Sequence, residues 1–275
     1  MKLLFSEQNS DYRNYQFPYA IWAVPDAGEA PADLFDAGFL PSSRFLDRFY
    51  LCRQIRVDLG KFKATSENRR IGRKCAGFTV KLVPRAEFDY SPARRDFFKT
   101  YADAKFGEDV MSYERLDGLF SAPIISHLLV FTDPATESEV GVVTLYLEDD
   151  RLAYYYYAFY DLAYFERNLG MFMMTSAVEF FAKRGVRHLY LGTCYSQNAL
   201  YKTQFKGAHF FNGFRWSGNL GELKHIIGRD GRGSGRHLLE SDDYVDKFCP
   251  GGLPEMTGAS VFRVKLGEGR LKVSG

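Results

Sequence analysis

Three stretches in the middle of the chain alternate apolar and polar residues with the two-residue period of a half-buried strand. They are His127–Thr132, Val140–Leu147 and Leu152–Tyr160. The short segments between them, Asp133–Thr136 and Asp149–Asp150, consist of residue types that form tight turns. The pattern therefore predicts an antiparallel meander of three strands.

Directly after this meander the apolar period changes to that of a helix. We predict a helix over Leu169–Arg184, because its large apolar residues share one face and Gly185 is suited to end it. A short apolar strand over Val186–Leu191 and a second helix over Gln197–Phe205 follow. The predicted fold class is therefore α+β, a mixed sheet that combines the meander with a β-α-β crossover. This order of elements is also that of the GNAT acyltransferase core.

The remaining segments predict fewer elements. Residues 1–41 indicate irregular structure with short strands or one short helix near Ala32–Ala37. Two further strands are predicted over Phe45–Val57 and Gly77–Val83, and a helix begins at Ser91 with Pro92 in its first position. Residues 228–235 contain so much glycine that they predict a flexible loop, and residues 260–266 predict a last strand. We expect a small N-terminal region, residues 1–75, before a GNAT-like acyltransferase domain, residues 76–275.

Composition restricts the function classes without selecting one. Among 275 residues, 46% are hydrophobic and 25% charged, the balance of a globular chain. The net charge of +2 does not by itself indicate a nucleic-acid partner, and no apolar segment reaches the length of a membrane span or resembles a signal peptide. The four cysteines contain no CxxC pair and the five histidines show no ligand spacing, so we expect a reduced cytoplasmic protein with no metal site and no membrane partner.

A candidate anion site lies where the long helix begins. The segment Arg167, Asn168, Leu169, Gly170, Met171 and Phe172 places a glycine-bearing turn at a helix N-terminus, where free backbone N–H groups favour a pyrophosphate or a terminal nucleotide phosphate. GNAT enzymes carry Arg or Gln, then two residues, Gly, one residue and Gly or Ala at this turn. Here Arg167 and Gly170 match that pattern, but Phe172 stands where the small residue belongs. An ordinary helix cap fits the motif equally well.

A basic run lies between Arg53 and Lys74. This run contains eight basic residues and only two acidic ones, Asp58 and Glu67, and Phe62 lies within it. Such a concentration is expected where a protein contacts a phosphate backbone, although most charged runs are simply solvated surface. The candidates for contact with an RNA backbone are Arg56, Lys63, Arg69, Arg70, Arg73 and Lys74.

Two groups of residues resemble the arginyl/leucyl-tRNA–protein transferase family. The first is Phe159-Tyr160-Asp161, Asn168-Leu169-Gly170-Met171-Phe172, Leu189-Tyr190-Leu191-Gly192-Thr193 and Tyr201-Lys202. The second is Cys52-Arg53-Gln54-Ile55-Arg56-Val57, Phe62, Ser66, Arg69-Arg70 and Arg73-Lys74. The sequence departs from the family at Phe49, where a CxxC partner usually stands, and in a shortened stretch before Tyr201-Lys202.

The resemblance implies transfer of an arginine- or leucine-type amino acid from charged tRNA to the α-amine of a protein or peptide N-terminus. No cofactor is implied, because the charged tRNA is the co-substrate. Asp161 is then a candidate proton acceptor or amine-orienting group, although it fits a helix cap equally well. Tyr195 and Lys202 follow the crossover strand where GNAT acceptors bind, and Lys202 is a candidate for holding a phosphate or the leaving ribose.

Two alternatives remain open at this point. One is a GNAT enzyme that transfers an acyl group from acyl-CoA to a small amine, against which Phe172 and the basic run argue. The other is a non-catalytic relative that binds RNA or protein, which the missing cysteine and the shortened segment keep open.

Overall fold

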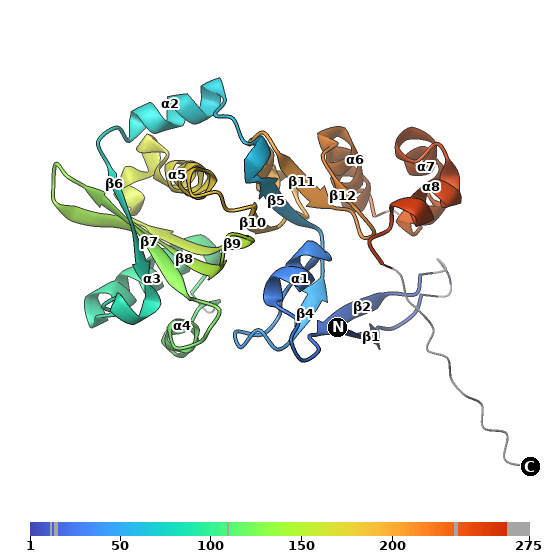
Figure 1. Cartoon of the computed structure of the whole chain (residues 1–275), viewed down its shortest axis with the longest axis horizontal. Helices are drawn as coiled ribbons and strands as arrows, with labels where there is room; N and C mark the ends of the chain where they lie inside the picture. Colours follow the sequence, from blue (N-terminus) through green and yellow to red (C-terminus); the bar gives the residue numbers. More distant parts are fainter. Residues whose placement is uncertain (12, 14–15, 109, 234–235, 263–275) are drawn as a thin grey trace, which may run out of the picture.

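The computed structural model describes residues 1–11, 13, 16–108, 110–233 and 236–262 (Figure 1). A mixed sheet of eight strands runs through its centre, in the order β12-β11-β5-β10-β9-β8-β7-β6. Its strands are β5 (Gln54–Asp58), β6 (Thr79–Pro84), β7 (His127–Asp133), β8 (Ser138–Glu148), β9 (Leu152–Tyr160), β10 (His188–Thr193), β11 (Ala208–Phe211) and β12 (Trp216–Ser217).

The predicted meander and crossover are confirmed. Strands β7, β8 and β9 pair antiparallel in sequence order. Helix α5 (Leu169–Lys183) then returns the chain to β10, which pairs parallel to β9. The fold class is therefore the expected one, α+β with a GNAT-like mixed sheet.

Helices cover both faces of the large sheet. Helix α5 packs on one face together with α2 (Ser66–Lys74) and α6 (Leu220–Gly231), and their apolar residues share one core. Helices α3 (Pro92–Phe106) and α4 (Tyr113–Phe120) cover the meander on the opposite face around Phe98, Phe120 and Phe159. The chain continues through α7 (Asp242–Phe248) and α8 (Gly252–Ala259), and short 3₁₀ helices are η1 (Leu59–Lys61), η2 (Arg85–Glu87), η3 (Leu162–Arg167), η4 (Gln197–Thr203) and η5 (Leu238–Glu240). Among the residues described, no helix is both long and apolar enough to cross a bilayer.

A second, four-stranded sheet in the order β1-β2-β4-β3 packs against the first (Figure 1). It contains β1 (Lys2–Glu7), β2 (Tyr19–Val24), β3 (Phe39–Pro41) and β4 (Phe49–Leu51), with helix α1 (Pro31–Asp36) between β2 and β3. Phe35 and Phe49 from this sheet region join Tyr154 and Tyr190 of the large sheet in one buried core. The predicted division at residue 75 stays a prediction, but β5 and α2, which precede it, are part of the large sheet and its helical layer.

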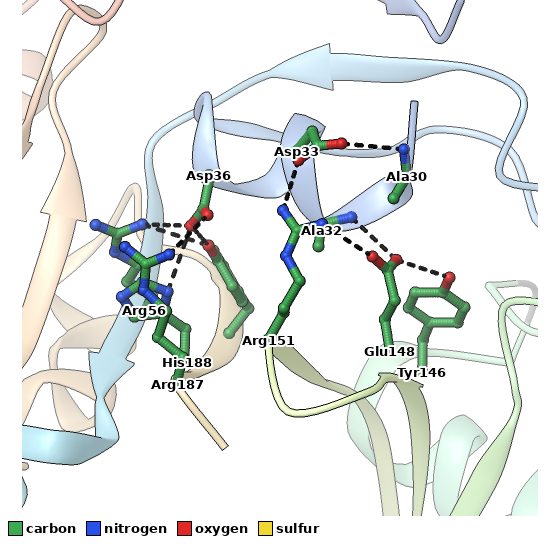
Figure 2. A network of polar contacts seen from close by, with 11 residues as sticks. Ala30, Ala32, Asp33, Asp36, Arg56, Tyr146, Glu148, Arg151, Arg187 and His188 are labelled. Carbon is green, nitrogen blue, oxygen red and sulfur yellow. Dashed lines mark hydrogen bonds and ion pairs between the residues drawn. The ribbon is translucent and has the colours of Figure 1, made fainter. Parts of the chain in front are cut away.

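Charged contacts fix α1 to the large sheet (Figure 2). The Asp36 carboxylate accepts hydrogen bonds from Arg56 at 2.9 Å and from the Tyr190 hydroxyl at 2.7 Å, and His188 Nδ1 lies 3.3 Å away. One turn earlier Asp33 pairs with Arg151 at 2.5 Å. Glu148 accepts from the backbone N–H of Ala32 at 3.1 Å. The small sheet is thereby held beside the centre of the large one.

Four expectations need correction. The stretch predicted as one strand over Phe45–Val57 is two short strands in different sheets, β4 and β5, because the chain crosses between the sheets at Cys52. The basic run contains a helix, α2, whose Ile71 is buried. Helix α6 continues to Gly231, so Arg232 and Gly233 are the described residues of the predicted glycine loop outside a helix, and 234–235 lie outside the described residues. Residues 260–262 are not in a strand, and the rest of that prediction, 263–266, lies outside the described residues.

The second predicted helix is present in a different form. The segment Gln197–Thr203 is the 3₁₀ helix η4, which is tighter than an α-helix and, at seven residues, long for its type.

Candidate active site

The parallel strands β9 and β10 separate along their length. Their ladder contains only residues 152–154 of β9 and 188–190 of β10. At Gly192, whose φ is +79°, β10 shifts its register against β5, and such a bulge bends a strand. The C-terminal ends of the two strands therefore enclose a gap between residues 155–160 and 191–193, which we call the fork.

The Lys202 side chain reaches the end of β10. Its ammonium donates a hydrogen bond to the Thr193 carbonyl at 2.8 Å. The neighbouring Cys194 N–H donates to the Arg53 carbonyl on the side of β5. Because successive residues of a strand direct their backbone groups to opposite sides, the Thr193 carbonyl points away from β5 and into the fork. The ammonium of Lys202 thus occupies the hydrogen-bonding position that β9 leaves free.

Desolvation lowers the pKa of Lys202, while the neighbouring Cys194 raises it. Among the described residues, no carboxylate lies within ion-pair distance of this ammonium. Lys202 therefore gives up a proton more readily than a solvated lysine. Burial raises the pKa of the fully buried Cys194 thiol, so this cysteine stays protonated and is a poor nucleophile.

Tyrosines from β9, α3 and η4 surround the fork. The buried Tyr155 interacts electrostatically with Tyr201, Tyr101 and Tyr160, and burial is the main cause that raises its pKa well above the usual value. The rings of Tyr101 and Tyr160 lie 4.8 Å apart. Tyr201 on η4 is 47% exposed and gives the site an aromatic surface open to solvent. Neutral phenols at neutral pH leave hydroxyl groups able to donate hydrogen bonds to a ligand.

Asn168 and Gly170 give the turn before α5 its backbone geometry. Asn168 adopts the left-handed conformation with φ +57°. A Cβ on Gly170 would lie 2.9 Å from the Tyr160 ring, so the absence of a side chain at Gly170 allows this ring to pack on the helix N-terminus. The turn and the fork are therefore adjacent.

Other residues of this turn make contacts inside the protein. Arg167 stacks on Phe78 at 4.5 Å and donates through Nε to the Lys74 carbonyl at 3.2 Å. Phe172 is buried and packs edge-on against Phe78 at 5.8 Å, and Leu169 is fully buried. Met171 Sδ accepts from Gln204 Nε2 at 3.5 Å. The aromatic residue at Phe172 therefore fills the core.

Two predicted catalytic residues also have structural partners. Asp161 caps η3, because its Oδ1 accepts from the Ala163 N–H at 2.9 Å. The Tyr195 hydroxyl accepts from the Arg53 N–H at 2.9 Å, and its ring lies 5.0 Å from the Arg53 guanidinium. Lys202 is therefore the predicted catalytic residue that the structure brings into the fork.

The basic run divides into a buried and an exposed part. Arg56 pairs with Asp36 and stacks on Trp216 at 3.9 Å, so its guanidinium is occupied inside the protein. Lys63, Arg69, Arg70, Arg73 and Lys74 are exposed. Arg70 pairs with Glu67 at 2.6 Å, whereas Lys74 reaches the Glu166 carbonyl of η3 at 3.3 Å. The C-terminal end of α2 thus places positive charge beside the turn that leads into α5.

Sequence reasoning did not select Thr193 and Tyr160 as site residues. Thr193 contributes a backbone carbonyl, and the direction of this carbonyl depends on strand pairing. Tyr160 follows five other aromatic residues of the same strand, so aromatic character alone does not distinguish it. Only its position opposite Gly170 distinguishes it.

Comparison with known proteins yields one relative in sequence. No protein-family model matches the chain. Over 218 residues it is 26% identical to the aspartate/glutamate leucyltransferase of Alkalilimnicola ehrlichii, covering 71% of this chain and 86% of that protein. The chain is similar to an aminoacyltransferase.

Solved structures with related backbones include FemX, with TM-score 0.40 and 9% identity over 52% of this chain and 53% of that chain. L-PGS from Bacillus licheniformis has TM-score 0.36 and 12% identity over 68% and 66% of the two chains. A GCN5-related N-acetyltransferase from Sphaerobacter thermophilus has TM-score 0.36 and 12% identity over 70% and 56%. The chain thus spans between half and two thirds of these structures' lengths, and the fold assignment rests on its own strand order.

Proposed function

We propose that this protein transfers an amino acid of the arginine or leucine type from charged tRNA to the α-amine of a protein or peptide N-terminus. The observation that carries the proposal is the similarity to a leucyltransferase over most of both chains. The fork, with Lys202 at its end, supplies a site suited to acyl transfer. The relative's name favours leucine as the donated residue and an aspartate or glutamate as the acceptor.

The reaction is aminolysis of an ester. The acceptor nitrogen attacks the ester carbonyl carbon, and the carbonyl oxygen becomes an oxyanion. The C–O bond to the ribose then breaks, and the proton lost by the nitrogen ends on the ribose oxygen. The site must therefore stabilise an oxyanion and move one proton.

Backbone groups of β9 suit the first task. Tyr157 N–H donates to Thr144 Oγ1, and Asp161 N–H donates to the Val140 carbonyl, both on the side of β8. By alternation the N–H groups of Ala158 and Tyr160 point to the other side, into the fork. Donors fixed in this way stabilise an oxyanion without reorganisation.

Lys202 suits the second task. Its ammonium can pass a proton to the leaving ribose oxygen and recover one from the attacking nitrogen, and its lowered pKa favours that exchange. The attacking α-amine has a pKa near neutrality and needs no strong base.

The exposed cations of α2 support a tRNA donor over acyl-CoA. Arg73 and Lys74 lie beside η3, which leads into the candidate anion turn, and a polyanion bound along α2 would end there. A coenzyme needs one pyrophosphate contact and no such extended basic surface.

A transfer assay tests the proposal directly. Purified protein is mixed with tRNA charged with radiolabelled leucine or arginine, or with labelled acetyl-CoA, and with peptides that differ only in the N-terminal residue. We expect label to move from the charged tRNA to the peptide N-terminus. If label moves from acetyl-CoA alone, the proposal of a tRNA donor is overturned. If no label moves from any donor, the proposal that this protein is a transferase is overturned.

A further inference from the structure

A pocket of about 190 Å³ lies on the helical side of the sheet, outside the fork. It is enclosed by the end of η4, by β11 and β12, and by the start of α6. Phe205, Phe210 and Leu223 form its apolar walls, and His209, Ser217 and Gly218 stand at its polar side. The pocket has room for one nucleobase between apolar surfaces.

Among the described residues, Nε2 of His209 is a ring nitrogen of this pocket without a hydrogen-bond partner. Ser217 Oγ donates to Glu222 at 2.6 Å and accepts from the Asn219 N–H at 3.2 Å. His209 Nδ1 lies 2.8 Å from the Gly207 carbonyl. A carbonyl only accepts, so Nδ1 carries the proton, and Nε2 of the neutral ring presents a lone pair.

The space in front of Nε2 is kept open by a glycine. A Cβ on Gly218 would lie 3.5 Å from Nε2 and 3.4 Å from Cδ2 of His209. Burial lowers the pKa of His209, as do Arg56 and Lys61, so the ring is neutral at neutral pH. The pocket therefore presents a hydrogen-bond acceptor between apolar walls, and it matches a planar ligand with an N–H donor.

Two exposed lysines lie near the pocket. Lys61 lies next to Gly207, its Cβ being 3.2 Å from the position of a Cβ there, and its ammonium pairs with Asp58 at 3.0 Å while the side chain is 66% exposed. Lys206, which precedes Gly207, is also exposed. Lys202, whose ammonium reaches the fork, directly precedes the pocket-lining Thr203. In the sheet order, β5 and β10 separate β11 at the pocket from the fork, so the pocket lies within a few strand widths of the fork.

We propose that this pocket binds one unpaired cytosine of the tRNA 3′ end, whose exocyclic amino group donates to His209 Nε2. The inference rests on the proposed function, because the charged terminal adenosine must reach the fork and the two cytosines before it must cross the adjacent surface. Cytosine presents an N4 amino donor, whereas uracil has the same shape with an O4 acceptor. Two acceptors would face each other in the uracil case.

Equilibrium binding of uncharged tRNA tests this subsite without any transfer step. The full chain is titrated with tRNA ending in CCA and with two variants in which either cytosine is replaced by uracil. For one of the two positions we expect the uracil variant to bind about three- to tenfold more weakly, the effect of one hydrogen bond. Equal binding of all three RNAs overturns the proposal.

Two variants and one control locate the effect. His209→Phe keeps an aromatic ring and removes the acceptor, and Gly218→Val covers Nε2 without altering His209. Both are expected to abolish the cytosine preference, and a preference that survives in both overturns the proposal. The control is His127→Phe, another half-buried histidine whose pKa is lowered by burial, on the distant strand β7, which should retain the preference.

The transfer assay separates the two proposals. If the wild-type protein transfers the amino acid but binds all three RNAs equally, only the cytosine subsite is overturned. A cytosine preference that depends on His209 in a protein without transfer activity supports the subsite and overturns the proposed reaction.

Discussion

Substitution of Asp36 by asparagine is expected to destabilise the junction between the two sheets. The Asp36 carboxylate faces the Arg56 guanidinium at 2.9 Å, and the side chain of Arg56 is only 15% exposed (Figure 2). An asparagine keeps the shape and can still accept from Tyr190. It removes the charge that compensates the largely buried guanidinium, and an unpaired buried charge is costly.

The size of the effect follows from the pKa of Asp36. Burial alone would raise it, but hydrogen bonds from His188 and Tyr190 and the charges of His188 and Arg56 lower it from 3.8 to about 2. Each pH unit corresponds to about 1.4 kcal/mol, so the carboxylate contributes about 2 kcal/mol to the free energy of unfolding at pH 7. Since the folded pKa is the lower one, this contribution is complete above pH 4, roughly halved at pH 3 and lost below pH 2.

Urea unfolding at a series of pH values measures the prediction. At pH 7 Asp36→Asn should lose about 2 kcal/mol, and the difference from wild type should shrink as the pH falls from 4 toward 2. The matched control is Asp33→Asn, on the same helix and also paired with an arginine, but 46% exposed. It should change stability by less than about 1 kcal/mol. Equal effects of the two substitutions, or a difference that does not depend on pH, would refute the reasoning.

Three further predictions concern the active site and its surroundings. Lys202→Gln should reduce the single-turnover rate of transfer by about a hundredfold or more, with little change in the KM for the acceptor. The control Lys183→Gln, at an exposed position, should leave that rate unchanged. Equal transfer rates for Lys202→Gln and the wild type exclude a role of Lys202 in proton transfer. The double variant Arg73→Gln, Lys74→Gln should weaken tRNA binding and lower the slope of log affinity against log salt by about 1 to 2, and an unaltered slope removes α2 from the RNA surface. Gly170→Ala should lower stability by about 1–3 kcal/mol in thermal unfolding, because the Tyr160 ring must move. Gly72→Ala, in a helix with open space around it, should stabilise by about 0.5–1 kcal/mol, and a loss there instead would contradict the space-based argument.

Local periodicity predicted the parts of the fold that depend on neighbouring residues. The strands of the meander pair in sequence order, and α5 buries one continuous apolar face, so both could be predicted from the residues themselves. Helix α2 was missed because it buries only Ile71 and Asn68, and its charged residues indicated a phosphate-binding surface. The predicted contact of these residues with an RNA backbone rests on their charge and does not depend on whether they lie in a helix.

Features that depend on distant pairing could not be predicted. No local pattern indicates that β5 inserts between β10 and β11, although this insertion turns the Arg56 side chain toward Asp36 and away from any phosphate. Lys202 was selected from the chain alone, but its contact with Thr193 exists only because β9 and β10 separate. The available lone pair of His209 likewise depends on the Gly207 carbonyl beside it.

The insertion of β5 between two strands made much later also sets the order of folding. During synthesis Gln54 emerges about 140 residues before its partner Thr193, which at ribosomal speeds is roughly seven to thirty seconds. Throughout that time β5 lacks both of its neighbours, and such long-range pairing makes folding slow. A fragment that begins at residue 76 would leave β10 and β11 separated by the width of a missing strand. The fork therefore depends on β5, which supports β10 from a position far earlier in the chain, and it can form only after nearly the whole large sheet has been translated.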